Sequence, residues 1–246
     1  MIVQIYEIQA PEEAEKCISL GVDHIGSVLV SEDSWRQPLL KEVIGLSQGT
    51  DSRNSLIPLF KNQDILYKVL DYYRPAYVHF CDSIPHHPGC RPFMDELIVR
   101  QSKLKEEFPE MGVIRSIPIP PKGEAQGFPT LKMGAIFEAT SDFFVIDTWL
   151  RTPPVGGFIG ITGKLADWGL ARELVLQSKI PVILAGGLSP ENVYEALLRV
   201  LPAGADSCTH TNAVDGRKRP IRFKKDFRQV ERFVNEVRRA GESIRL

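Results

Sequence analysis

The sequence has little cysteine and no long hydrophobic run. Its 246 residues include only four cysteines, too few and too widely spaced for a disulfide framework in a chain that can bury a large core. No segment approaches the roughly 20 apolar residues of a membrane-spanning helix. Residues 1–5 begin a strand-like pattern without the basic region or cleavage site of a signal peptide. These absences exclude a disulfide scaffold and a helical membrane anchor, and we expect a cytoplasmic protein.

An excess of charge of one sign is also lacking. The 30 lysines and arginines almost balance the 31 aspartates and glutamates, which gives a formal net charge of −1. A strongly basic surface that would attract nucleic acid or another polyanion is therefore not expected. The chain also has no internal repeat of fixed period and no low-complexity tract. We expect a small-molecule ligand, with neither nucleic acid nor membrane as a partner.

What the sequence does have is a regular alternation of two hydrophobic periods. Short β-branched or aromatic runs alternate with segments of helical period, giving eight strand–helix pairs. The expected segments are 2–8, 14–20, 24–30, 39–46, 56–60, 65–73, 77–80, 93–108, 113–117, 130–139, 143–146, 170–178, 181–184, 190–200, 205–208 and 227–238. Eight such units in roughly 250 residues are typical of a closed parallel barrel. The sequence predicts an α/β fold, a single (β/α)8 TIM barrel domain over residues 1–246.

Local signals mark helix starts and the face on which a site would lie. Pro11 and Pro190 fall in expected first helical turns beside acidic residues, and Ser189 is the expected N-cap. Two long loops rich in proline and glycine, residues 83–92 and 150–164, each follow a predicted strand. Loops that follow barrel strands form the catalytic face, so we expect both loops there. The glycines of the second loop would let it close over a ligand, and the alternative is that it is only a mobile surface loop.

The most informative segment is an apolar strand that ends at Gly186-Gly187 and leads into a helix start. Glycine lets backbone N–H groups approach a phosphate without a Cβ in the way, and a helix N-terminus favours negative charge. Loops after strands seven and eight are the usual phosphate site of this fold, which adds Thr209 and His210 as neighbours. The alternative interpretation is that the glycines serve only a tight turn.

Two further side chains are candidates for chemistry or binding. Asp147 ends an apolar strand, where partial burial would raise the pKa of its carboxyl group enough for it to act as an acid. A carboxylate that caps the following loop is the alternative. Arg36 offers a planar guanidinium for a carboxylate or phosphate, although an arginine in a loop is often only solvated.

Several stretches of the C-terminal half form one pattern. They are Ile146-Asp147-Thr148, Gly163-Lys164, Asp167-Trp168 and residues 184–193. The pattern resembles the phosphoribosylanthranilate isomerase family of tryptophan biosynthesis, and weaker similarities at residues 21–26, at Arg36 and at residues 60–62 extend it over nearly the whole chain. The resemblance implies a (β/α)8 barrel and an Amadori-type aldose–ketose isomerase that acts on a phosphorylated sugar without a cofactor or metal. It further implies Asp147 as the acid, Arg36 as a substrate-binding residue, and Gly163, Gly186 and Gly187 beside the bound phosphosugar.

Three segments of the expected active face depart from the family pattern. The family's first strand ends in a Cys-Gly pair that carries the general base, where this chain has Tyr6-Glu7. Its fourth strand usually ends in Gln-Leu-His-Gly, and its eighth is followed by Ser-Ser-Gly. The segments found here are His79-Phe80-Cys81-Asp82 and Cys208-Thr209-His210. We therefore expect Tyr6 or Glu7 in the base position.

Neither residue is a ready substitute for a thiolate, because their unperturbed pKa values are about 10 for tyrosine and about 4.3 for glutamate. Strand alternation points Tyr6 into the barrel, while Glu7 turns inward only if the strand has already ended. The alternative is that Tyr6 is a packed aromatic side chain and Glu7 a surface charge.

The fourth loop supports a second hypothesis. Possible metal ligands gather within twelve residues, namely His79, Cys81, Asp82, His86, His87 and Cys90. A divergent paralogue with another, metal-assisted reaction is therefore an alternative. No recognised ligand spacing is present, and the simpler interpretation is that His79 and Cys81 line the substrate pocket. A third hypothesis is a non-catalytic phosphosugar-binding protein, because the family's cysteine is missing. The sequence leaves open whether the protein is a monomer or a homodimer.

Overall fold

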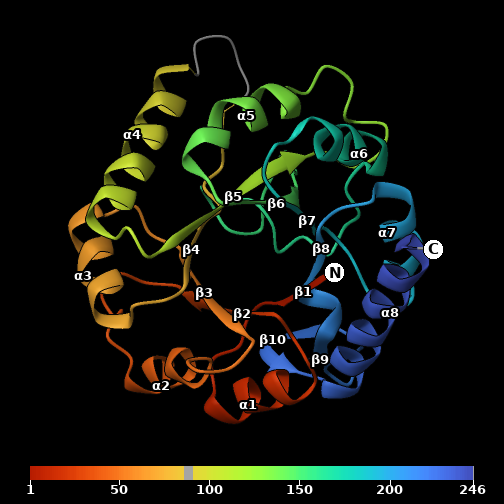
Figure 1. The fold of residues 1–246 in the computed structure, drawn as a ribbon, viewed down its shortest axis with the longest axis horizontal. Coiled ribbons are helices and arrows are strands. Elements are labelled where there is room, and N and C mark those ends of the chain that lie inside the picture. Colours follow the sequence, from red (N-terminus) through yellow and green to blue (C-terminus); the bar gives the residue numbers. More distant parts are fainter. Residues whose placement is uncertain (86–90, 246) are drawn as a thin grey trace.

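The computed structural model describes residues 1–85 and 91–245, and in it eight parallel strands close into a barrel (Figure 1). The strands are β1 (Ile2–Ile5), β2 (His24–Leu29), β3 (Arg53–Pro58), β4 (Tyr77–Phe80), β5 (Gly112–Ile119), β6 (Phe143–Thr148), β7 (Val182–Leu184) and β8 (Gly204–Ser207). Each strand pairs with the next, and β1 pairs with β8 to complete the ring. The predicted (β/α)8 barrel is confirmed.

The helices form an outer ring around the strands (Figure 1). They are α1 (Pro11–Ser19), α2 (Pro38–Leu46), α3 (Gln63–Tyr73), α4 (Arg91–Glu107), α5 (Thr130–Phe137), α6 (Trp168–Gln177), α7 (Val193–Val200) and α8 (Phe227–Arg245), with short 3₁₀ helices at Glu138–Thr140 and Thr209–Thr211. The predicted helix start at Pro11 is confirmed, since the proline occupies the first turn, where its missing N–H leaves no helical hydrogen bond unmade. No helix in the described part of the chain combines the length and apolarity needed to cross a membrane.

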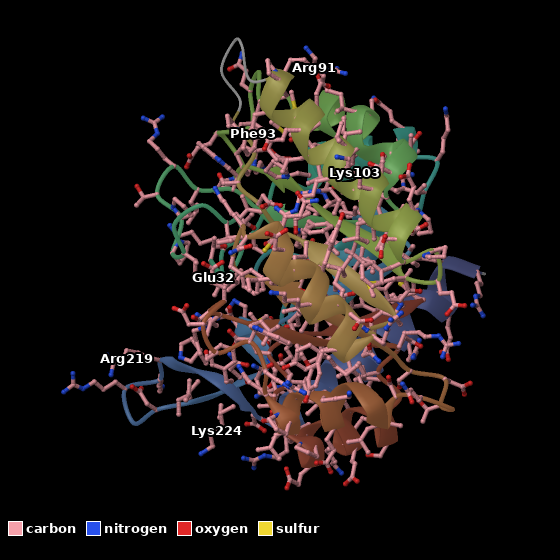
Figure 2. The ribbon with its side chains drawn as sticks, turned by 90° about the vertical axis from the view of Figure 1, so that its left-hand side faces the viewer. Glu32, Arg91, Phe93, Lys103, Arg219 and Lys224 are labelled. Carbon is pink, nitrogen blue, oxygen red and sulfur yellow. The ribbon has the colours of Figure 1, made fainter. Side chains whose placement is uncertain are left out.

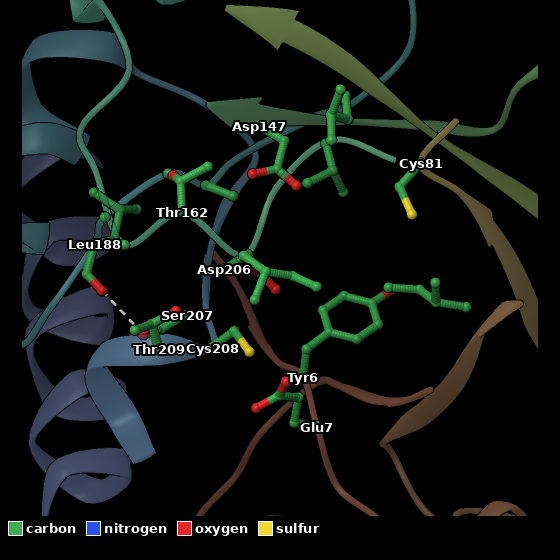
Figure 3. A pocket seen from close by; sticks show the side chains of 18 of the residues that line it. Tyr6, Glu7, Cys81, Asp147, Thr162, Leu188, Asp206, Ser207, Cys208 and Thr209 are labelled. Atoms are coloured by element: carbon green, nitrogen blue, oxygen red, sulfur yellow. Dashed lines mark hydrogen bonds between the residues drawn. The ribbon is translucent and has the colours of Figure 1, made fainter. Parts of the chain in front are cut away.

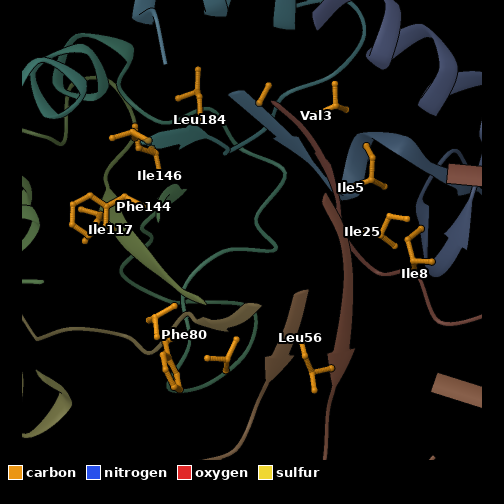
Figure 4. Packing of buried hydrophobic residues seen from close by; sticks show 14 of the residues in the cluster. Val3, Ile5, Ile8, Ile25, Leu56, Phe80, Ile117, Phe144, Ile146 and Leu184 are labelled. Carbon is orange, nitrogen blue, oxygen red and sulfur yellow. The ribbon is translucent and has the colours of Figure 1, made fainter. Parts of the chain in front are cut away.

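The main hydrophobic core lies between the strands and the helices (Figure 4). Along β6, Phe144 and Ile146 belong to this outer core, whereas Val145 packs in a second, smaller cluster with Ile114 and Ile183 of the neighbouring strands. Successive side chains of a strand point to opposite faces, so the residue after Ile146 must face the barrel interior. The same alternation holds on β1, where Val3 and Ile5 pack outward.

Two local predictions were wrong. The first strand ends at Ile5 instead of residue 8, because Glu7 adopts a left-handed backbone conformation with φ of 65° that turns the chain. The seventh helix begins at Val193, and Ser189 is not its N-cap. The Ser189 amide instead donates to the side chain of Asn192, at 2.9 Å, within a turn that precedes the helix.

A hairpin that the sequence analysis did not predict lies between β8 and α8. Its strands are β9 (Asn212–Val214) and β10 (Pro220–Lys225), paired antiparallel with an irregularity in register. Asp215 holds the turn, because its carboxylate accepts from the amides of Arg217 and Arg219 at 2.8 and 2.9 Å. The hairpin projects from the body of the barrel (Figure 2).

Candidate active site

A pocket opens at the carboxyl ends of the barrel strands (Figure 3). Residues at the carboxyl ends of seven of the eight barrel strands, all but β5, line it, together with the loop after β6 and the hairpin. The carboxyl ends of parallel strands meet at one end of a barrel, so residues far apart in the sequence converge there. Of the residues expected at a site, the lining includes Tyr6, Glu7, His79, Cys81, Asp147, Gly163, Gly186, Gly187, Thr209 and His210.

Asp147 faces the pocket from β6, as the alternation along that strand requires. Burial raises the pKa of its carboxyl group to about 7, while a hydrogen bond from the amide of Thr148, at 3.0 Å, partly opposes the shift. A carboxyl group with this pKa is protonated in a large fraction of molecules at neutral pH. It can therefore donate a proton, which the unperturbed group could not do.

The loop after β6 contributes directly to this burial. Ile159 donates its amide to the carbonyl of Cys81, and Ser83 donates to the carbonyl of Gly157, both at 2.9 Å, so the loop is fixed to the end of β4. Gly160 follows with φ of 94°, and a Cβ at this position would lie 2.2 Å from Oδ2 of Asp147. Only glycine fits here, and its backbone excludes water from one side of the carboxyl group.

Asp206 is a second carboxyl group in the same pocket, which was not predicted from the sequence. It points inward from β8, since the preceding Ala205 packs in the outer core. Burial is the main cause that raises the pKa of Asp206 to about 7, and the charge of Asp147 adds to it. A hydrogen bond from Nε2 of Gln4, at 3.1 Å, acts in the opposite direction. The strand-end position after an outward alanine was the available signal.

Tyr6 points into the barrel, but its surroundings keep it protonated. Its hydroxyl accepts a hydrogen bond from Ser55 at 2.9 Å and lies 2.6 Å from Nδ1 of His79. The tyrosine proton therefore points to Nδ1, and Nε2–H of His79 donates to Ser116 at 2.8 Å. Burial raises the pKa of Tyr6 well above its usual value and lowers the pKa of His79 to about 3. At neutral pH both are uncharged, and neither is a strong base.

Glu7 has a different environment, because it is buried and ion-paired. Its carboxylate accepts from Nε of Arg222 at 2.6 Å, from Nδ2 of Asn212 at 2.9 Å and from the amide of Phe223 at 3.2 Å. Burial acts to raise the pKa of Glu7, but these hydrogen bonds and the positive charge of Arg222 outweigh it, so the pKa is lowered. A carboxylate held in this way is a poor proton acceptor.

The two thiols in the pocket do not replace the cysteine that the first strand lacks. Cys81 and Cys208 both line the pocket. Burial raises the pKa of each thiol above its ordinary value, chiefly because the thiolate would lose its hydration. Both are neutral thiols at physiological pH.

The residues expected to hold a phosphate gather on the opposite side of the pocket from β3. Gly186 and Gly187 both have positive φ, and a Cβ on Gly187 would lie 2.7 Å from the backbone of Lys164. These glycines thus allow the turn after β7 to pack against the loop after β6. His210 closes the group, because its Nε2 lies 3.1 Å from the carbonyl oxygen of Gly163. Thr209 lines the same part of the pocket.

Arg36 is not among the residues that line this pocket. It is exposed in the loop after β2, and its guanidinium lies 4.9 Å from the ring centroid of Tyr72, on the outer side of the barrel. The expectation that Arg36 binds the substrate is therefore not supported by its position. The arginine that does line the pocket is Arg222 of β10, which the sequence analysis missed. Asp215-Gly216, a typical hairpin-turn pair, was the signal that could have revealed its hairpin.

The possible metal site is only partly described. His86, His87 and Cys90 lie outside the described residues. Of the other candidates, His79 is hydrogen-bonded to Tyr6 and Ser116. Asp82 accepts a hydrogen bond from buried Arg115 at 2.9 Å. Within residues 1–85 and 91–245, histidine, cysteine and acidic side chains form no group of three suited to a metal ion.

The fold and the site define a class of protein: a (β/α)8 barrel with two carboxyl groups of raised pKa in its mouth and a glycine turn after β7. Residues 126–209 match the family described as N-(5'phosphoribosyl)anthranilate (PRA) isomerase. The N-(5'-phosphoribosyl)anthranilate isomerase of Methanosarcina acetivorans is 29% identical over 238 residues, which cover 96% of this chain and 92% of that protein. The chain is therefore similar in sequence to phosphoribosylanthranilate isomerases, the family that its sequence motifs had indicated.

Other relatives match less of the chain or at lower identity. The enzyme of that name from Methanocella arvoryzae is 35% identical over 135 residues, which cover 55% of this chain and about half, 54%, of that protein. The solved structure of phosphoribosyl anthranilate isomerase from Thermotoga maritima has a TM-score of 0.70 at 20% identity, covering 97% of this chain and 99% of that one. At this identity the likeness shows the shared barrel fold.

Proposed function

We propose that this protein is a phosphoribosylanthranilate isomerase, an aldose–ketose isomerase that acts on N-(5'-phosphoribosyl)anthranilate. The observation that carries the proposal is the pair of inward-facing carboxyl groups, Asp147 and Asp206, whose pKa values both lie near 7. An Amadori rearrangement needs one acid and one base, and a coupled pair that titrates near neutral pH supplies both. The similarity to phosphoribosylanthranilate isomerases supports this activity.

In the proposed mechanism, Asp147 is the acid. It gives its proton to the ring oxygen of the ribose while the bond from that oxygen to C1 breaks, and the nitrogen lone pair forms a double bond to C1. Asp206, in its carboxylate form, then removes the proton from C2. The electrons of that C–H bond form a C1–C2 double bond while the second pair of the C1–N double bond returns to nitrogen. Loss of the O2 proton and protonation of C1 give the ketose.

The phosphate group is proposed to bind at the turn of Gly186 and Gly187, beside Gly163, Thr209 and His210. The absence of a Cβ at Gly186 and Gly187 lets the turn after β7 pack closely against the loop after β6, and glycines of both segments line the pocket. This part of a (β/α)8 barrel, between the loops after strands seven and eight, is a frequent phosphate site. His79 and Cys81 are proposed as neutral groups of the pocket wall.

The structure favours Asp206 over Tyr6 as the base, and one substitution tests this. Tyr6→Phe removes a hydroxyl with two buried partners, so we expect a loss of about 1–2 kcal/mol of stability. We expect kcat/KM to fall by less than about tenfold, since general acid–base groups typically contribute about 10²–10⁴-fold. Urea denaturation and steady-state kinetics check the two values. A loss of activity in the range of a catalytic group would identify Tyr6 as the base.

The activity itself is tested by the loss of substrate fluorescence when the purified protein meets freshly prepared N-(5'-phosphoribosyl)anthranilate. We expect turnover by the wild type and a rate about 10²–10⁴-fold lower by Asp147→Asn. A folded wild-type protein that is stabilised by phosphosugars but gives no turnover would contradict the proposal and favour a non-catalytic binding protein.

A cytoplasmic location and a monomeric or homodimeric state remain predictions from the sequence. The Thermotoga maritima relative is described as dimeric.

A further inference from the structure

The hairpin β9–β10 brings a permanent positive charge to the mouth of the barrel. Among the described residues that line the pocket, Arg222 is the only lysine or arginine. The same lining contains three carboxyl groups, those of Glu7, Asp147 and Asp206. Without Arg222, the charged side chains of the pocket would all be carboxyl groups, and the pocket would repel a ligand with two anionic groups.

The geometry of Arg222 leaves part of its guanidinium free for a ligand. Nε donates to Oε1 of Glu7 at 2.6 Å, and the guanidinium lies 4.6 Å from the ring centroid of Phe223. Within residues 1–85 and 91–245, the η nitrogens of Arg222 have no hydrogen-bond partner. The side chain is 40% exposed, and the residue lines the pocket. Free η N–H groups in one plane match the two oxygens of a carboxylate.

The protein holds this arginine in place at the cost of backbone strain. Glu7 and Phe223 both have left-handed backbone conformations, with φ of 65° and 60°, and the amide of Phe223 donates to the Glu7 carboxylate. Non-glycine residues with a left-handed backbone conformation concentrate at functional sites, where surrounding contacts maintain the strained conformation. At the base of the hairpin, buried Lys225 donates to Oδ1 of Asn212 and to the carbonyl of Cys208, which ties β10 to the end of β8.

The pocket wall next to this arginine is apolar. Val28 comes from β2, and Ile57 and Leu59 come from β3 and the residue that follows it. β2 pairs with β1, and Glu7, the ion-pair partner of Arg222, follows β1. The candidate phosphate-binding residues follow β7 and β8. An aromatic ring is therefore best accommodated near β2 and β3, with a ring carboxylate within reach of the hairpin.

We propose that Arg222 binds the carboxylate on the aromatic half of the substrate, and that Glu7 is a positioning residue that orients Arg222. This inference rests on the proposed function, because that function supplies the aromatic carboxylate. It assigns to the hairpin the role that the sequence motifs had suggested for Arg36. The hairpin thus selects substrates by the aromatic group, separately from the carboxyl pair that carries the chemistry.

The test compares two substrates in wild type and Arg222→Gln: N-(5'-phosphoribosyl)anthranilate and the analogous phosphoribosyl aniline, which lacks only the ring carboxylate. For Arg222→Gln we expect kcat/KM on the first substrate to fall about 10- to 100-fold, the size expected for a charged hydrogen-bonded contact. On the aniline analogue we expect a change of less than about threefold, because the group that Arg222 contacts is absent. Lys224→Gln is the matched control, since it removes one exposed positive charge from the same strand, and we expect it to behave as wild type.

Each outcome decides one question. An equal loss on both substrates would place Arg222 at the phosphate or in a structural role and overturn the proposal, as would no loss on either. Turnover of neither substrate by the wild type would instead contradict the proposed function. For Glu7→Gln we expect KM for the carboxylated substrate to rise about tenfold with kcat nearly unchanged, and Glu7→Asp to recover part of the loss. A fall in kcat alone would exclude the positioning role.

Discussion

Asp147→Asn is expected to lower kcat by about 10²–10⁴-fold while the protein stays folded. Asparagine has nearly the same shape and still accepts the hydrogen bond from the amide of Thr148, but it cannot donate a proton to the ring oxygen. Steady-state kinetics with N-(5'-phosphoribosyl)anthranilate measure the loss, and circular dichroism checks the fold. Asp51→Asn, at an exposed turn remote from the pocket, is the control and is expected to keep full activity. An active Asp147→Asn variant would remove Asp147 from the mechanism.

The same variant has a pH-dependent effect on stability, whose sign follows from the raised pKa. Between pH 4 and 7 the unfolded chain has already released the Asp147 proton, whereas the folded protein still holds it, so wild-type stability falls as the pH rises. Asparagine does not titrate, so the variant does not lose this part of its stability as the pH rises. We expect the variant to gain about 2–4 kcal/mol relative to wild type between pH 4 and pH 8, at about 1.4 kcal/mol per pKa unit. Urea denaturation at both pH values measures the gap, and a gap that does not change with pH would show that the pKa is not raised.

Asp206→Asn is expected to lower kcat by a similar factor, about 10²–10⁴-fold, because the group that removes the C2 proton is lost. In the wild type, kcat/KM should follow a bell-shaped pH profile with its maximum near pH 7, since one carboxyl group must be protonated and the other ionised. In Asp206→Asn the acidic limb of the profile should disappear, because no base remains to be ionised. A residual rate that keeps the wild-type bell shape would exclude Asp206 as the base.

The coupling between the two groups gives this prediction an independent readout. The charge of Asp147 is one cause of the raised pKa of Asp206, so Asp147→Asn should lower the pKa of Asp206 below about 7. Carbon-13 NMR titration of the side-chain carboxyl groups measures it. An unchanged value would mean that the two carboxyl groups titrate independently and do not form a coupled pair.

Local sequence signals were reliable where a single physical rule dominates. The alternation of β6 places Asp147 in the barrel, because Phe144 and Ile146 must be buried against the helices. The first turn of α1 begins at its proline for the same kind of local reason. Ser189 is not the N-cap of α7, because its amide donates to the side chain of Asn192 in a turn that precedes the helix. Both residue types can cap a helix, so the sequence alone does not show at which of the two the helix begins.

The carboxyl pair and the hairpin arginine depend on contacts between distant parts of the chain. Asp206 has its raised pKa because closure of the barrel between β8 and β1 buries it, and the charge of Asp147 on β6 adds to the shift. Glu7 is an ion-pair partner because a hairpin about 215 residues later reaches over it. Neither environment is encoded in the neighbouring residues.

The sequence by itself therefore determined the (β/α)8 barrel, the inward direction of Asp147 and Tyr6, and the glycine turn after β7, because hydrophobic period and backbone conformation are local properties. Only the tertiary structure decided which inward groups can exchange a proton at neutral pH and which arginine lines the pocket. Burial, charge and hydrogen bonding set a pKa, and these arise where the ends of all the strands meet.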